Sequence, residues 1–499
     1  MSSDARKFLK GVTSGYLVMI ISLLVNLWLI PFVLKFLTRP EYGIFAIATD
    51  LLAWLSLANL GISAAFNSKG AHLLGSKDVK ELNIVASTTF FTQLVSAIVI
   101  ILAGVFVTIN PELLFGSDVN ADNIELVVVL LVSGYTLSFI FQPMNSMLIA
   151  SKQIHIDNYL KFGLLIIKTS LTVILLMNGF KLLSLAISSF VATIIITIVT
   201  WIRVKKSLPY VKISLNLWKY NRFTFLLKKG VWFSLGGIAG ILILRMDSFL
   251  IGKYISLSTV ASYVITIKLY QIADTFHQQF FNTTRPFFAQ MFGRKDMKSL
   301  SKMYNITFYS SFAAAFGIGI CIYLLNRWFV YLWVGSDFYL GDTINMLLCL
   351  NFILQASVLP NRIILATTFF KIASHNIIRF LEGVVKLLAS IALLYYWGIE
   401  GVILAGLISS LIFSNIVLNI FTGQFFKEIA WNKLTLILFI SIIPLIIIFV
   451  TNNQLRLVLF TFLIASVFVF VWRKIRKQNI NYSSVDLNFV GLIKNILLK

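Results

Sequence analysis

Two stretches of this chain carry the same short motif, which indicates an internal repeat. They are GSKDVKEL at residues 75–82 and GRKDMKSL at 293–300, and both read G-x-K-D-x-K-x-L. Each motif follows two long apolar segments, and a Gly-Val pair opens the first segment of each copy, at residues 11–12 and 230–231. In an apolar chain, a parallel repeat predicts two homologous membrane bundles that face each other across a central cleft.

The composition requires lipid as the solvent for most of the chain. Of the 499 residues, 59% are hydrophobic and 12% are charged, and the mean hydropathy is +0.90. A water-soluble globule could not hide so much apolar surface. Cys321 and Cys349 both lie in apolar segments, so the sequence offers no disulfide framework and no cysteine spacing typical of a metal site.

The hydropathy profile predicts an all-α polytopic membrane protein with about 14 transmembrane helices, because roughly 20 apolar residues cross the hydrocarbon core. The repeat pairs the first six helices with the next six, as two parallel six-helix lobes related by a pseudo-two-fold axis, and leaves two extra C-terminal helices. The expected helices span residues 12–37, 43–66, 85–109, 124–150, 159–178, 181–202, 231–252, 259–282, 305–325, 343–368, 374–397, 399–422, 434–450 and 455–472.

Four parts of the chain follow from this pattern. They are an N-terminal six-helix lobe (1–202), a basic amphipathic cytoplasmic linker (203–229), a C-terminal six-helix lobe (230–424), and the last two helices with a basic cytoplasmic tail (425–499). Most of the 42 Lys and Arg fall on one side of this topology. The positive-inside rule therefore predicts that both termini and both copies of the repeated motif are cytoplasmic. Topology and anionic lipid headgroups account for the net charge of +23, so no nucleic-acid partner is expected.

Ionisable residues inside the expected helices are the main candidates for function. Each costs roughly 2.5 to 3.5 kcal/mol at the middle of a membrane helix, so these residues must face one another or water. The candidate cations are Arg245, Lys268, Lys386, Lys168, Arg362 and Arg379, and the candidate acids are Asp50, Asp247, Asp274 and Glu382. Asp50 is the only acid expected deep in the first lobe. Amides expected to line a polar cavity are Gln142, Asn145, Gln271, Gln278 and Gln355.

Two interpretations of these polar residues remain open. Arg379, Glu382 and Lys386 recur at steps of three and four residues, so they share one helix face and either pair with one another or also line the cleft. The amides either join helices by hydrogen bonds or contact a substrate. Arg245 and Asp247 are about 200° apart around a helix axis, so they must point to different neighbours.

Two segments resemble a known family of transporters. EYGIFAIATDLLAWLSLANLGISAAF at 41–66 resembles the second helix of polysaccharide flippases, and RMDSFLIGKYISLSTVASYVITIKL at 245–269 resembles the start of their second half. The resemblance covers about the first 425 residues. It indicates the Wzx-type O-antigen and capsule flippases of the multidrug/oligosaccharidyl-lipid/polysaccharide (MOP) exporter superfamily. These loose hydrophobic patterns indicate the superfamily better than the substrate.

The resemblance implies a flippase of the bacterial cytoplasmic membrane that is not an enzyme. Such a protein moves undecaprenyl-pyrophosphate-linked oligosaccharide from the inner to the outer leaflet by alternating access, for O-antigen, capsule or exopolysaccharide synthesis. The cations would then bind pyrophosphate, the amides would contact sugar, and the acids would neutralise the cations or bind a coupling ion. The expected partners are the lipid-linked oligosaccharide, membrane lipids and other glycan-assembly proteins. No metal or cofactor is expected beyond coupling to H+ or Na+.

Two alternatives stay open. A multidrug or cation exporter of the same superfamily would share the topology but use carboxylates in its first half. A membrane polymerase, ligase or glycosyltransferase would use the same lipid-linked sugar, but the chain shows no catalytic residue set and no phosphate-binding loop.

Overall fold

A computed structural model describes residues 3–76, 78–116, 123–151, 153–368 and 371–425 of the chain. Helices make up nearly all of these ranges, and no strand occurs in them, which confirms the predicted all-α class. Ten of the described helices are long and apolar enough to cross a membrane, so the expected number of about 14 is not confirmed. The expected helices 434–450 and 455–472 and the basic tail lie outside the described residues.

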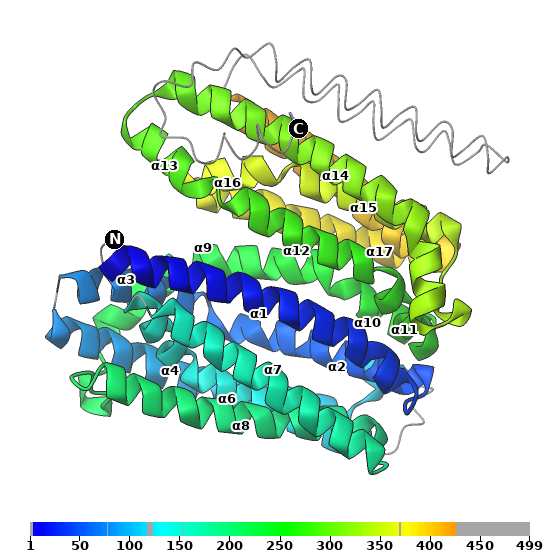
Figure 1. The fold of residues 1–499 in the computed structure, drawn as a ribbon, viewed down its shortest axis with the longest axis horizontal. Coiled ribbons are helices and arrows are strands. Elements are labelled where there is room, and N and C mark those ends of the chain that lie inside the picture. The colour runs from blue at the N-terminus through cyan, green and yellow to red at the C-terminus, as the bar shows by residue number, and fades with distance from the viewer. Residues whose placement is uncertain (1–2, 77, 117–122, 152, 369–370, 426–499) are drawn as a thin grey trace.

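The first half of the chain forms one group of helices, which occupies the lower part of Figure 1. In this group α4 packs on α6, α6 on α8, and α7 on both α8 and α1. The elements are α1 (Ser3–Leu34), α2 (Arg39–Leu55), the 3-10 turn η1 (Ser56–Asn59), α3 (Ile62–Gly75), α4 (Val79–Ile109), α5 (Glu112–Phe115), α6 (Ile124–Ala150), α7 (Ile154–Met177) and α8 (Lys181–Ser207).

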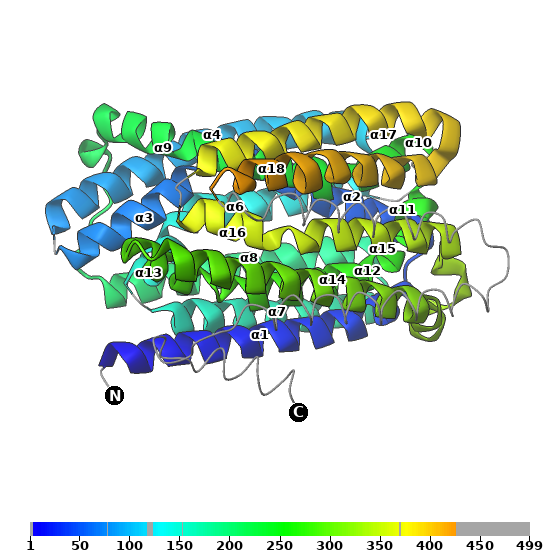
Figure 2. The same cartoon turned by 90° about the horizontal axis from the view of Figure 1, so that it is seen from above.

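The second half repeats this packing. Its α14 packs on α15 as α4 packs on α6, and its α9 packs on α17 as α1 packs on α7. Most helices of both halves run along the long axis of the molecule (Figure 2). The elements are η2 (Leu215–Leu217), α9 (Tyr220–Leu244), α10 (Met246–Tyr254), α11 (Leu257–Thr266), α12 (Lys268–Asn282), α13 (Arg285–Gly293), α14 (Met297–Val334), η3 (Ser336–Phe338), α15 (Asp342–Ser357), α16 (Leu359–Thr367), α17 (Ile372–Ser409), the π-helix η4 (Ser410–Val417) and α18 (Leu418–Gly423).

The aspartates of the two repeated motifs cap equivalent helices. Asp78 Oδ1 accepts the backbone N–H of Glu81 at the start of α4, and Asp296 Oδ1 accepts that of Ser299 at the start of α14, both at 3.0 Å. Their backbone angles also agree, at φ −81° and ψ 81° against φ −84° and ψ 76°. The preceding helices α3 and α13 lie at the same end of the molecule, on the left in Figure 1. The repeat is thus visible in local geometry as well as in packing.

Four of the expected membrane helices are interrupted, which corrects the boundaries predicted from hydropathy. Hydropathy averages over a window longer than a turn, so it joined the two pieces even where the sequence holds a turn or kink signal, as at residues 59–61 and Pro360. Irregular backbone at membrane depth is tolerated where it is buried in protein or lines a polar cavity, so the breaks mark positions of interest. They fall at Leu60-Gly61 between η1 and α3, at Arg245 between α9 and α10, at Ile267 between α11 and α12, and at Val358 before α16.

The last pair of expected helices in the second lobe is joined at a kink. Trp397 and Gly398 have non-helical backbone angles inside α17, and Gly398 has φ 55°, a left-handed value that glycine adopts without steric cost. This kink falls between the expected helices 374–397 and 399–422. The expected boundary is therefore present, although no loop separates the two helices.

The region between the two halves is hydrogen-bonded to α4. The Lys212 N–H donates to Asn83 Oδ1 at 3.0 Å, and the Lys219 N–H donates to Thr88 Oγ1 at 3.2 Å. Arg222, already inside α9, pairs with Glu81 at 2.6 Å. The expected linker 203–229 thus contains the end of α8 and the start of α9, with a docked segment between them.

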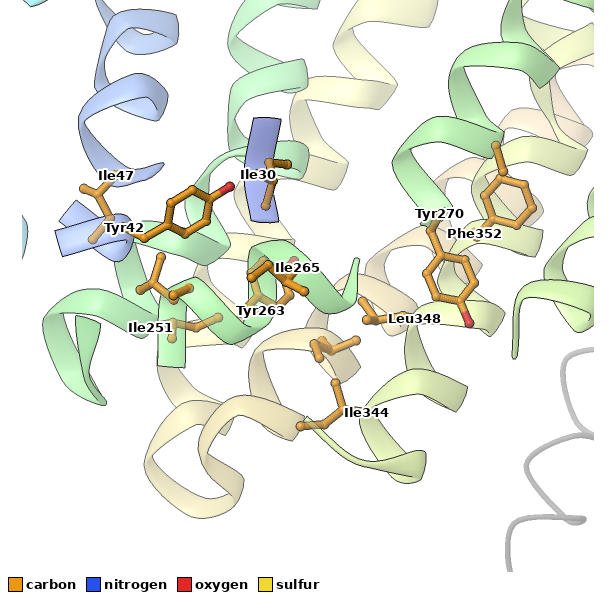
Figure 3. Packing of buried hydrophobic residues seen from close by; sticks show 14 of the residues in the cluster. Ile30, Tyr42, Ile47, Ile251, Tyr263, Ile265, Tyr270, Ile344, Leu348 and Phe352 are labelled. Carbon is orange, nitrogen blue, oxygen red and sulfur yellow. The ribbon is translucent and has the colours of Figure 1, made fainter. Parts of the chain in front are cut away.

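A large apolar core joins the two halves at one end of the molecule. Tyr42 of α2, Ile251 of α10 and Tyr263 of α11 belong to it (Figure 3). Glycine at position 43 permits this approach, because a Cβ atom there would lie 2.1 Å from the backbone oxygen of Leu257. Helices α2 and α11 therefore touch backbone to backbone.

Two polar contacts reinforce the closure at this end. The Trp333 indole N–H donates to the backbone oxygen of Leu27 at 2.6 Å. Arg39, at the start of α2, pairs with Asp337 of η3 at 2.6 Å and lies 4.8 Å from the centroid of the Phe338 ring. Each contact joins a residue of the first half to one of the second.

Candidate functional site

An ion pair connects the two halves at a helix break. The Arg245 guanidinium donates to Asp50 Oδ1 at 2.7 Å, so the junction of α9 and α10 is tied to α2. The Asp50 side chain is 11% exposed and that of Arg245 is 51% exposed. A guanidinium carries five N–H donors, so Arg245 keeps donors for a further acceptor while it binds Asp50.

Lys268 follows the next helix break along the chain, and among the described residues it has no ion-pair partner. It is half-buried at the first position of α12, directly after the break at Ile267. Among the described residues no carboxylate lies within ion-pair distance of its ammonium, and Arg245 is close enough to repel it. Asp50, Arg245 and Lys268 therefore form a group with one excess positive charge, which we call the central cation group.

Lys386 is enclosed in the protein rather than presented to a cleft. Its ammonium lies 2.8 Å from Asp247 Oδ1, and it also donates to the backbone oxygen of Ile243. The Tyr263 hydroxyl donates to the other Asp247 oxygen at 2.8 Å. The two charged side chains are only 4% and 10% exposed. This geometry argues against the expected role of Lys386 in substrate binding.

Glu382 is the centre of a buried hydrogen-bond network that includes Arg362 and Arg379. Its oxygens accept from Gln355 Nε2 and from the Ser414 hydroxyl, both at 2.7 Å. Arg362 and Arg379 both donate to Gln355 Oε1, at 2.6 and 3.1 Å. Glu382 is fully buried and lies 3.9 Å from Arg379. The pairing of Glu382 with Lys386 that the helical spacing allowed does not occur, because Asp247 holds that lysine.

The polar stripe of α12 is more open. Gln271 and Gln278 are exposed and Asp274 is half-buried, with Gln278 Nε2 donating to Asp274 Oδ2 at 2.7 Å. Asp274 is the only one of the four candidate acids, all within the described residues, that has no ion-pair partner.

In the first half, Gln142 joins a polar network at the break between η1 and α3. Its Oε1 accepts from Asn59 Nδ2 at 2.7 Å and from the Ser63 hydroxyl at 3.0 Å. Gln93, which is 1% exposed, donates to the same Ser63 hydroxyl at 2.6 Å. The sequence analysis named Gln142 and missed Asn59, Ser63 and Gln93. The Asn-Leu-Gly turn at 59–61 was the available signal.

Asn145 belongs to a second polar region inside the first half, and Lys168 does not line it. Asn145 lines a cavity together with Asp157 of α7. Lys168 is half-buried further along the same helix. Asp157 is 4% exposed and lies in the first turn of α7, so the first half holds a buried acid at a helix end that the sequence analysis did not name. The cause is the helix boundary, because α7 begins at Ile154 and not at the expected residue 159.

The candidate residues therefore separate into distinct groups. Asp50 binds Arg245 at one helix break and Lys268 follows the next break, Asp247 binds Lys386, and Gln355, Arg362, Arg379 and Glu382 share one network. Asn145 and Lys168 lie apart from all of these, in the first half. Within the described part of the chain, no group of three or more His, Cys, Asp or Glu could hold a metal ion.

Comparison with known proteins gives a consistent picture. The model of a family described as polysaccharide biosynthesis protein matches residues 33–340. An inward-facing multidrug resistance MATE-family transporter of the MOP superfamily is similar in structure, with a TM-score of 0.66 and 14% identity over 84% of this chain and 100% of that one. The lipid II flippase MurJ in an inward closed conformation has a TM-score of 0.62 and 14% identity over 93% and 99% of the two chains.

A MATE transporter from Vibrio cholerae has a TM-score of 0.59 and 11% identity over 86% of this chain and 98% of that one. No curated protein sequence matches the chain. At these identities the likeness to solved structures shows a common fold, and the function depends on the site.

Proposed function

Because this chain belongs to the polysaccharide biosynthesis protein family and is a multi-pass membrane protein with the fold of MOP-superfamily transporters, we propose that it flips undecaprenyl-pyrophosphate-linked oligosaccharide. The substrate moves from the inner to the outer leaflet of a bacterial cytoplasmic membrane. Its glycan serves O-antigen, capsule or exopolysaccharide synthesis, together with other proteins of glycan assembly. Both termini of the transporter are cytoplasmic in this proposal.

The central cation group carries the proposal. A pyrophosphate that leaves water for a membrane protein must replace its hydration, and charge interactions are several-fold stronger at low dielectric. Arg245 offers a planar set of donors suited to phosphate oxygens, and Lys268 adds a point charge. The N-termini of α10 and α12 begin at the same breaks. Half-helix N-termini at helix breaks are a recurrent way for transporters to hold anionic groups.

The contacts between the halves support alternating access. Gly43 against Leu257, Trp333 against Leu27 and Arg39 against Asp337 close one end of the molecule. The copies of the repeated motif lie at the opposite end (Figure 1). With those motifs cytoplasmic, the closed end is the outer one. The headgroup then enters the central cation group from the cytoplasmic leaflet, and separation of the outer contacts releases it.

The other charged groups have supporting roles. The Asp247–Lys386 pair and the network around Glu382 hold α10, α15, α16, η4 and α17 together. Asp274 is our candidate for the acid that binds a coupling proton or sodium ion, because its charge is not taken up by an ion pair. A cation exporter is less favoured, because the group at the helix breaks has an excess of positive charge.

Substitution of the central cations tests the proposal. In a strain that depends on this protein for its surface glycan, Arg245→Ala and Lys268→Ala should each lower glycan export roughly tenfold or more, with normal protein accumulation. Arg245→Lys should retain part of the export. Since Arg245→Ala leaves Asp50 unpaired, the double substitution Asp50→Asn/Arg245→Ala must also fail. Lys253→Ala, at an exposed position of α10, is the matched control. Normal export by the alanine variants would refute the proposed role.

A further inference from the structure

A hollow inside the first half has a lining unlike that of the central cation group. It lies between α6, α7 and α8 and has a volume of about 100 Å³. Sites that enclose a whole small molecule typically measure roughly 300 to 1,000 Å³, so this hollow has room for only part of a ligand, such as one edge of a sugar ring. Its polar lining includes Ser138, Asn145, Asp157, Lys161, Thr197 and Thr200.

On α7, Asp157 and Lys161 lie one turn apart on one helix face, which is buried at Asp157 and exposed at Lys161. Other exposed positions of these helices are apolar, as shown by Ile166 on α7 and Ile198 on α8. Polar groups in membrane helices carry a cost, so the buried Asp157 marks a position of functional interest.

The chemistry of the lining suits a neutral polyhydroxylated ligand. Its single acid, Asp157, and its single base, Lys161, form an ion pair at 2.6 Å, so the two charges cancel. A carboxylate accepts hydrogen bonds, an ammonium donates them, and amide and hydroxyl groups do both. Adjacent sugar hydroxyls need this mixture. The Lys161 side chain is 61% exposed, which leaves it free to bond a ligand while Asp157 stays fixed in the wall.

The hollow is connected to the rest of the proposed pathway through α6. Ser138, Gln142 and Asn145 lie at steps of four and three residues, so they share one face. Gln142 is exposed and binds Asn59 at the break between η1 and α3. A polar track therefore runs from the hollow to a helix break in the first half.

We propose that the hollow between α6, α7 and α8 is a carbohydrate-binding subsite for the glycan of the lipid-linked substrate. This inference rests on the proposed function. It assigns the two halves different tasks: the first half recognises sugar hydroxyls, and the helix breaks of the second half hold the charged headgroup. The affinity for a substrate that carries its glycan then exceeds the affinity for the bare lipid pyrophosphate.

Binding to the purified full-length protein tests the subsite. The two probes are undecaprenyl pyrophosphate and the lipid-linked glycan extracted from the strain that carries this gene after its export is blocked. We expect the wild-type protein to bind the glycan-carrying lipid more tightly. Asn145→Leu and Thr197→Val should each weaken that binding roughly tenfold and leave the binding of undecaprenyl pyrophosphate unchanged. Thr136→Val is the matched control, because the Thr136 hydroxyl donates to Val132 O outside the hollow.

The outcomes separate this inference from the proposed function. If the wild-type protein binds both lipids equally, the glycan is not recognised and the subsite is refuted, while the flippase proposal stands. If the variants keep the full advantage for the glycan-carrying lipid, the hollow holds water only and the inference fails. If the wild-type protein binds neither lipid, the proposed function fails and the subsite fails with it.

Discussion

The Lys386 ammonium lies 2.8 Å from the Asp247 carboxylate, inside the protein and 139 positions away in sequence. The pair joins α17 to α10, the short helix that begins at the break carrying Arg245. Arg245, two residues earlier, is half exposed and holds Asp50 instead. Arg245 and Asp247 thus have different environments although they lie two residues apart. Arg245 faces an accessible surface, and Asp247 is buried in the protein.

The buried pair of Asp247 and Lys386 predicts that substitution of Lys386 lowers the stability of the protein rather than its ability to bind substrate. Lys386→Ala leaves the Asp247 charge buried without its cation, which should lower the free energy of unfolding by about 3 to 5 kcal/mol. The double substitution Asp247→Asn/Lys386→Met removes both charges and should recover most of that loss. Thermal unfolding in detergent measures both. If Lys386→Ala is as stable as wild type but does not export, Lys386 is a substrate-binding residue after all.

The contact between Arg39 and Asp337 predicts that the outer end must open during transport. In a Cys321→Ser/Cys349→Ser background, Arg39→Cys with Asp337→Cys should be linked by a short bifunctional thiol reagent. The link should stop glycan export, because the two halves can no longer separate at that end. Each single cysteine, treated in the same way, is the control. Unimpaired export by the linked protein would show that this end does not open.

A Cβ atom at position 43 should disturb the same closure from within the core. It would meet the backbone oxygen of Leu257 at 2.1 Å, and backbone on a packed helix cannot move aside as a flexible side chain does. Gly43→Val should therefore shift the population toward the state with the outer end open. Thiol accessibility of Leu37→Cys, at a buried position of this core, measures this shift, which we expect to be an increase. Gly237→Val, where nothing lies within 4 Å of an added Cβ, is the control.

Asp274 predicts dependence on a coupling ion. Asp274→Asn keeps the size of the side chain and its bond with Gln278 but cannot bind a proton or sodium ion by charge. In reconstituted vesicles, transport of the lipid-linked glycan should lose its response to imposed proton or sodium gradients and retain slow, gradient-independent exchange. Gln271→Leu tests whether any polar change on α12 has this effect. A full response to the gradients in Asp274→Asn would assign coupling elsewhere.

The cap of α14 predicts a pH-dependent contribution to stability. The Ser299 backbone N–H and hydroxyl lower the pKa of Asp296 in the folded protein. A carboxyl with a lowered folded pKa stabilises the protein above its unfolded pKa, which is about 3.9, and this contribution is lost as the pH falls through the folded value. Asp296→Ala should therefore unfold more readily than wild type at neutral pH, and the difference should shrink in acid. Asp296→Asn, which still caps the helix, should lose the pH dependence but keep most of the stability.

The sequence predicted the class of fold because its main signals are local. Apolar runs long enough to cross lipid identify helices, and the duplicated G-x-K-D-x-K-x-L motif identifies two related halves, whose Asp78 and Asp296 cap equivalent helices. Hydropathy missed the breaks at Arg245 and Val358, since its average runs over a window longer than a turn and a single charge or proline does not divide an apolar run. It also placed the start of α7 too late and so overlooked Asp157.

Spacing along the chain determined by itself that Arg245 and Asp247 point in different directions and that Arg379, Glu382 and Lys386 share a face. Only the tertiary structure decided which partner each one takes. Asp50 binds Arg245 across 195 positions of sequence, and Lys386 prefers Asp247 to the nearer Glu382. The physical reason is that buried charges must be paired, and the partner is whichever opposite charge helix packing brings within reach. That choice separates the accessible Arg245 from the enclosed Lys386, and no property of either residue in the sequence alone distinguishes them.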